Sequence, residues 1–84
     1  MDPKLMVEKA TSLAWAQFET EHPNLAASLE RIFGDQSRAR VIQSLQNDQR
    51  YQSLVEQTDA EADIGAIVSS LLPIVTDVAM KLLL

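Results

Sequence analysis

The sequence contains no cysteine, a single histidine and only two glycines among its 84 residues. Without cysteine, the chain can form no disulfide and offers no thiolate to a metal or a substrate. One histidine is too few for a typical zinc site. Two glycines thirty-one residues apart do not form a phosphate-binding loop. We therefore expect no catalytic residues, no metal ligands and no cofactor, and a protein that is not an enzyme.

Two short acidic motifs have the spacing of metal sites but lack the rest of the pattern. Asp59-x-Glu61-x-Asp63 matches the first half of a calcium-binding loop, yet the positions that need glycine and a bidentate glutamate hold Ile64 and Ser70. Acids at the start of a helix explain this motif better. The second, a Glu-x-x-His pair that ends at His22, occurs once and stands directly before a proline.

The net charge is −5, and it is unevenly distributed. Residues 1–30 carry two lysines and five acids, residues 31–50 four arginines and two acids, and residues 51–84 one lysine and five acids. Nucleic-acid-binding surfaces are strongly basic. The middle segment is the only basic one, so we expect no nucleic-acid partner. Its arginines should instead pair with acids of the first and last helices, or of a partner.

A helix-turn-helix regulator that uses residues 31–50 is the alternative function. Gly34 would lie in its turn, with Arg38 and Arg40 at the start of the recognition helix. The agreement of this segment with the helix-turn-helix pattern is incomplete, because Asp35 and Arg40 fall where the pattern has packing residues. Glu30 also occupies a position that usually needs a small residue.

Helical patterns recur along the chain, and no alternating β-branched run suggests a strand. Asp2 is a good N-cap, and Pro3 suits the first turn of a helix that should run to about residue 20. A second helix is expected over residues 23–33, followed by Gly34 as a left-handed cap. The apolar stripes of these two helices are Met6, Ala10, Leu13, Ala14 and Phe18, and Leu25, Leu29, Ile32 and Phe33.

Asp35 can cap a third helix, and the Asn47-Asp48 pair suggests a break before a fourth apolar stripe. These could be two helices or one bent helix, since aspartate is a poor helix residue but not a breaker. The stripes are Ala39, Val41, Ile42 and Leu45, then Tyr51, Leu54 and Val55. Residues 58–61, Thr-Asp-Ala-Glu, match a capping box that would open the last helix.

Residues 64–84, the last quarter of the chain, are apolar at two positions in every three. Apolar residues in this quarter repeat at alternating steps of four and three, the spacing of a coiled-coil contact. We call these residues the heptad seam: Ile64, Val68, Leu71, Val75, Val78 and Leu82. A second run passes through Ile67, Leu71, Ile74 and Val78. The narrow opposite face holds Gly65, Ser69, Pro73, Asp77 and Lys81, and Pro73 should kink the helix.

These features predict an all-α fold, a small bundle of four or five helices in one domain over residues 1–84, with a long, Pro-kinked, strongly apolar C-terminal helix. A domain of this size buries only about 60–65% of its unfolded surface, so oligomerisation would help it. Burial of the last helix in a monomer core is the competing interpretation. An exposed Trp15 would be an anchor for a partner.

We therefore expect a non-catalytic, small acidic protein–protein interaction or oligomerisation module, a homodimer or a partner of another protein. The expected interface residues are Trp15, Tyr51, Ile64, Val68, Leu71, Val75, Val78 and Leu82. The leucines at the end of the chain should pack in a subunit or partner groove.

The N-terminal residues Met-Asp-Pro-Lys lack the basic and apolar regions of a signal peptide, so we expect a cytoplasmic protein. The last helix is long enough for a bilayer, but Asp77 near its middle would cost about 2.5–3.5 kcal/mol there. We expect no membrane partner.

Overall fold

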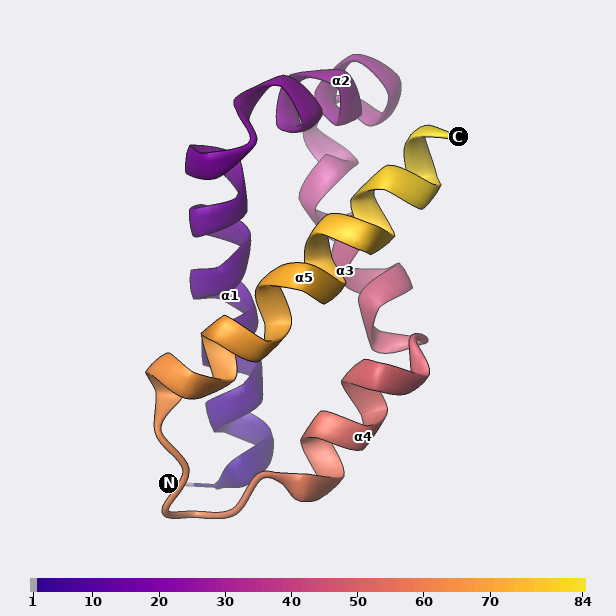
Figure 1. Cartoon of the computed structure of the whole chain (residues 1–84). Coiled ribbons are helices and arrows are strands. Elements are labelled where there is room, and N and C mark those ends of the chain that lie inside the picture. The colour runs from indigo at the N-terminus through magenta and orange to yellow at the C-terminus, as the bar shows by residue number, and fades with distance from the viewer. Residues whose placement is uncertain (1) are drawn as a thin grey trace.

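The computed structural model describes residues 2–84, which form helices and connecting turns and no strand (Figure 1). In chain order the elements are α1 (Pro3–Glu21), α2 (Pro23–Phe33), the short 3₁₀ turn η1 (Gly34–Gln36), α3 (Ser37–Gln46), α4 (Gln49–Gln57) and α5 (Ile64–Leu83). The predicted all-α bundle with a long apolar C-terminal helix is confirmed. Of the two interpretations left open for residues 35–57, two helices or one bent helix, the structure shows two separate helices, α3 and α4.

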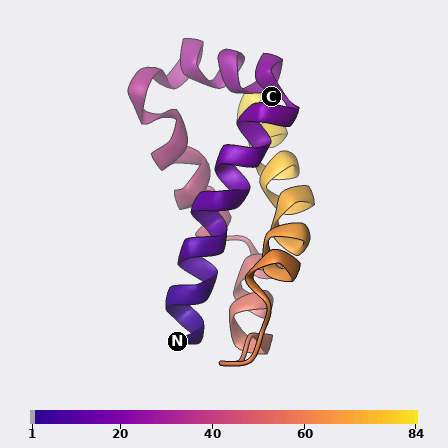
Figure 2. The ribbon, with the colours of Figure 1, turned by 90° about the vertical axis from the view of Figure 1, so that its left-hand side faces the viewer.

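Helix α5 crosses the front of the bundle obliquely, first over α1 and then over α3 (Figure 1). Its main packing partner is α1. Helix α2 crosses one end of the molecule at a steep angle to α1, as the perpendicular view shows (Figure 2). The molecule measures 38 × 22 × 19 Å.

The core is formed by side chains from every helix. The large side chains that are fully buried are Phe18, Leu29, Leu45, Leu71, Val7, Val41 and Val75. Thr11 is the one polar residue buried among residues 2–84, and its hydroxyl donates to the Val7 carbonyl at 2.7 Å. No buried side-chain polar atom of the described chain lacks a hydrogen-bond partner. The interior is therefore almost wholly apolar.

Three aspartates cap helices by the same contact. Each carboxylate accepts from the backbone N–H two residues further on: Asp2 from Lys4, Asp48 from Arg50, and Asp63 from Gly65. Such contacts satisfy N–H groups that have no partner within the helix. The prediction that Asp2 caps the first helix and that a break falls at Asp48 is confirmed.

The prediction that Asp35 caps the third helix is wrong. Gly34 has φ +61°, so the expected positive φ is confirmed, but its ψ of −136° lies outside the left-handed helical region. The chain then makes a 3₁₀ turn, in which the Ser37 N–H donates to the Gly34 carbonyl. Because this turn leads almost directly into α3, no side chain caps that helix.

The predicted capping box at residues 58–61 is also wrong. Thr58 ends α4, and its hydroxyl donates back to the Leu54 carbonyl at 2.7 Å. Asp59 accepts from the Glu61 N–H within a turn, at 2.9 Å. The last helix therefore begins only at Ile64, with Asp63 as its cap.

Three residues of the predicted apolar stripes lie on the surface, the small Ala39 and two large side chains. Leu13 is 47% exposed and Ile32 is 58% exposed. In α1 the buried face is turned slightly, so that Val7 and Trp15 take part in the core. Pro73 lies inside α5, which the structure describes as one helix from Ile64 to Leu83, and the expected kink stays a prediction.

Candidate interaction surface

The structure buries six of the eight expected interface residues inside the single chain. Val68, Leu71, Val75 and Val78 of the heptad seam are at most 9% exposed. Ile64 and Leu82, at the two ends of the seam, are half-buried against the same core. The seam therefore packs within the chain, as the competing interpretation of a core helix required. In this conformation a second molecule can reach only its ends.

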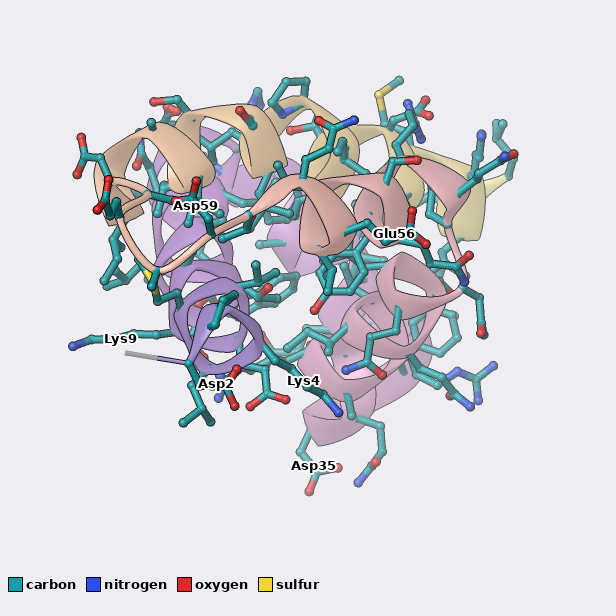
Figure 3. All side chains as sticks on the ribbon, turned by 90° about the horizontal axis from the view of Figure 1, so that it is seen from below. Asp2, Lys4, Lys9, Asp35, Glu56 and Asp59 are labelled. Atoms are coloured by element: carbon teal, nitrogen blue, oxygen red, sulfur yellow. The ribbon has the colours of Figure 1, made fainter. Side chains whose placement is uncertain are left out.

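Trp15 and Tyr51 are both 7% exposed. The Trp15 ring lies 5.3 Å from the Phe18 ring, centroid to centroid, in a tilted arrangement that favours aromatic packing. The structure therefore places Trp15 in the core, where it is not an exposed anchor. Tyr51 lines a groove of about 530 Å³ between α1 and α4, with Lys4 and Glu56 on its two sides (Figure 3).

One stripe along the solvent side of α5 holds no charged residue. Ala66, Ser69, Pro73, Met80 and Leu84 are exposed and Thr76 is half-buried; we call these six residues the outer stripe. They recur at steps of three and four, so they share one face of the helix. Met80 is 51% exposed. The Thr76 hydroxyl is already satisfied by the Leu72 carbonyl at 2.9 Å, which lowers the polarity of the stripe further.

No residue of the outer stripe is charged. Charge on α5 is confined to Asp77 and Lys81, whose side chains form an ion pair with an N–O distance of 3.3 Å. Asp77 also accepts from the Arg50 guanidinium at 2.7 Å, at the edge where α4 meets α5. Unlike the paired side chains of Asp77, Lys81 and Arg50, the side chains of Lys9 on α1 and Asp35 in η1 project away from the bundle into solvent (Figure 3).

Arg50 is the centre of an ion-pair cluster at the start of α4. Its guanidinium binds both carboxylate oxygens of Asp48, at 3.0 and 2.8 Å, besides Asp77. The hydrogen bond from Arg50 lowers the pKa of Asp48 to about 2. Hydrogen bonds from Arg50 and then Lys81 lower the pKa of Asp77, and the bonds to Asp48 and Asp77 raise the pKa of Arg50. The expectation that arginines pair with acids of the last helix holds for Arg50.

The other arginines of the basic segment are engaged differently. Arg38 donates to the Ser12 hydroxyl of α1 at 3.0 Å. The Arg40 guanidinium lies over the Phe33 ring, 4.9 Å from its centroid, in a cation–π contact. Neither of them, nor Arg31, forms an ion pair within residues 2–84. Arg38 and Arg40, which the helix-turn-helix alternative assigns to DNA, thus make contacts within the fold.

The described part of the chain brings no three His, Cys, Asp or Glu side chains together in a way that could hold a metal ion. One helix in residues 2–84, α5, has the length and composition of a membrane-crossing segment, although 39% of its most apolar window is buried within the chain.

Our sequence reasoning missed the outer stripe, because it counted only the two apolar runs. It assigned Ser69 and Pro73 to a narrow opposite face together with Asp77 and Lys81. A signal was present: between Asp63 and Asp77 the sequence holds no charged residue on any side of the helix.

Comparison of the chain with protein-family models, with curated proteins and with solved structures finds no match in any of the three.

Proposed function

We propose that the protein is a non-catalytic helical interaction module that forms a homodimer through the outer stripe of α5. The observation that supports this proposal is that the outer stripe of α5 holds no charged residue and presents Met80 to water, while Asp77 and Lys81 lie beside it. An exposed helix face normally carries charged or polar residues, and the outer stripe has only the hydroxyls of Ser69 and Thr76. The fold of one chain covers only the inner side of α5.

A second copy suits this stripe because of its charge pattern. In a dimer with twofold symmetry, the same patch of both subunits meets, so a charge near the symmetry axis would face its own copy. The outer stripe has no charge, although the chain as a whole carries −5. The small residues Ala66 and Ser69 would also let two helices approach closely, since the interaxial distance depends on the side chains at the contact.

Sedimentation equilibrium over a wide concentration range tests this proposal. Wild type should show a dimer, and Met80→Asp should shift the equilibrium toward folded monomer, because a buried unpaired carboxylate at the contact is costly. Leu5→Asp is the matched control: Leu5 on α1 is 55% exposed, against 51% for Met80, and its replacement should leave the dimer unchanged. Monomeric wild type at every concentration would refute the proposal.

A helix-turn-helix regulator remains the weaker alternative. Its support is the charge of α3, which carries Arg38 and Arg40 and no acid. The contacts of these arginines to Ser12 and Phe33 and the net charge of −5 count against it. Salt-dependent binding of duplex DNA that Arg40→Glu abolishes, measured by fluorescence anisotropy, would favour this alternative.

A further inference from the structure

The groove beside Tyr51 extends beyond the space between α1 and α4. A second hollow of about 180 Å³, between α1 and α3, shares Glu8, Gln46 and Tyr51 with it. The two hollows therefore form one depression around Tyr51, which we call the Tyr51 groove. Its larger part, of about 530 Å³, falls within the range of about 300–1,000 Å³ that is typical of small-molecule sites.

The Tyr51 side chain is buried, and its hydroxyl has no partner in the fold. Tyr51 is 7% exposed, and no hydrogen bond within residues 2–84 involves its hydroxyl. Every side-chain polar atom of the described chain that is shut off from solvent has a partner, so this hydroxyl must reach the groove. Thr11, which lines the same groove, differs because its hydroxyl donates to the Val7 carbonyl at 2.7 Å. Buried polar groups are normally hydrogen-bonded, so the Tyr51 hydroxyl is left for water or a ligand.

The walls of the Tyr51 groove carry more acceptors than donors. Glu8 of α1 and Glu56 of α4 are exposed on opposite walls and form no ion pair within residues 2–84. Lys4 is the one cationic side chain among the described residues that line the groove, so two glutamates and one lysine give it a net charge of −1. The Gln52 amide donates to the Gln46 carbonyl at 3.2 Å, which leaves its side-chain oxygen to accept. Such a site favours a cationic ligand that is rich in N–H donors.

We propose that the Tyr51 groove binds a small alkylguanidinium compound, whose guanidinium group lies between Glu8 and Glu56 and donates to the Tyr51 hydroxyl. A guanidinium group has five N–H donors and no acceptor, and its planar fork matches carboxylates. The half-buried Ile42 and Val55 line the groove and would cover the alkyl part. None of these residues belongs to α5, so the site is separate from the proposed dimer contact.

Titration of the full chain with butylguanidine at fixed pH and ionic strength, followed by amide NMR spectra, tests the site. The amides that shift should cluster in the parts of α1, α3 and α4 that border the groove. Butylurea, which has the same shape without the charge, should bind about five- to tenfold more weakly, because hydrogen bonds to charged groups are stronger than neutral ones.

Tyr51→Phe separates a binding role of the hydroxyl from a structural one. The substitution keeps the ring in the core and removes a hydroxyl that has no partner in the fold, so the free energy of unfolding should not change. Binding of butylguanidine should weaken about two- to tenfold, as expected for the loss of one hydrogen bond. A loss of stability with unchanged binding would contradict the assignment of this hydroxyl to the site.

The charged walls are tested by neutral replacements. Glu56→Gln should weaken binding about two- to fivefold, as expected for one exposed ion pair. Glu30→Gln is the charge-matched control: Glu30 is exposed on α2 and does not line the Tyr51 groove, so binding should not change. Lys4→Gln should strengthen binding, because it removes a charge of the same sign as the ligand.

Three results would overturn the proposal. Absence of amide shifts at millimolar butylguanidine would show that the groove holds no such ligand. Shifts scattered over the whole surface, or equal losses from Glu30→Gln and Glu56→Gln, would reveal only a general attraction of cations to an acidic chain. Much tighter binding of a blocked arginine tripeptide than of butylguanidine would assign the groove to a protein partner in place of a small molecule.

Discussion

At the scale of single residues, two side chains of α5 define its two environments. Leu71 is fully buried, and Met80, nine positions further on, is 51% exposed. Leu71→Ala should lower the free energy of unfolding by about 2–5 kcal/mol, because it leaves a cavity in the core. Met80→Ala should change the free energy by no more than about 0.5 kcal/mol in the monomer. Urea titrations at low protein concentration measure both, and similar small losses would contradict the assignment of Leu71 to the core.

Asp48 makes stability depend on pH in the acid range. Its folded pKa of about 2 lies below the usual value of 3.8, so its contribution is complete above about pH 4 and is lost as the pH falls toward 2. Asp77 acts in the same direction. Asn can still accept from the Arg50 N–H, so Asp48→Asn keeps the cap and removes the titration.

The urea midpoints of wild type and Asp48→Asn, measured from pH 7 to pH 2, should therefore differ most at neutral pH and converge at pH 2. A difference that stays constant over this range would show that Asp48 is not titrating as the geometry requires.

The residue scale is also where sequence reasoning was least complete. The buried positions of α5 were correct, because apolar residues recur there on a wide face. Leu13 and Ile32 were assigned to buried stripes although both are exposed. Which edge of an amphipathic stripe is covered depends on where the neighbouring helix crosses, and a single-helix pattern does not contain that information.

At the scale of elements, Pro73 makes α5 less stable than its composition allows. A proline inside a helix costs about 3 kcal/mol relative to alanine, offset by up to about 1 kcal/mol because it also restricts the unfolded chain. Pro73 is exposed, so its replacement disturbs no packing. Pro73→Ala should raise the free energy of unfolding by about 1–2 kcal/mol in urea titrations at low protein concentration. A lower stability would show that α5 needs the bend that proline favours.

The helix boundaries separate what local sequence determines from what it does not. The second helix was predicted at about residues 23–33, which agrees with the structure, because Pro23 and Gly34 mark its ends. The start of the last helix was misplaced, because three possible N-caps lie close together. Thr58, Asp59 and Asp63 fall within six residues, and each has a side-chain oxygen that can accept from a backbone N–H. In the structure Asp63 is the N-cap of α5, and its neighbours Ala62 and Ile64 pack against the core.

At the scale of the whole molecule, composition was enough for the fold class and not for the interaction surface. The helix-forming residues and N-caps of the chain can be read from its sequence, and they are enough to predict a small helical bundle. Whether an apolar helix packs inside its own chain or against another depends on contacts between distant segments. Those contacts cover the heptad seam and leave the outer stripe of α5 uncovered.

The absence of cysteine from the chain allows a direct test of which face forms the dimer. Ser69→Cys places one thiol in the outer stripe, and Ala16→Cys places one on the exposed side of α1. Under mild oxidation at equal concentration, Ser69→Cys should form a disulfide-linked dimer much faster than Ala16→Cys, because only the former is held beside its copy. Equal rates, or faster linkage through Ala16→Cys, would contradict self-association through α5.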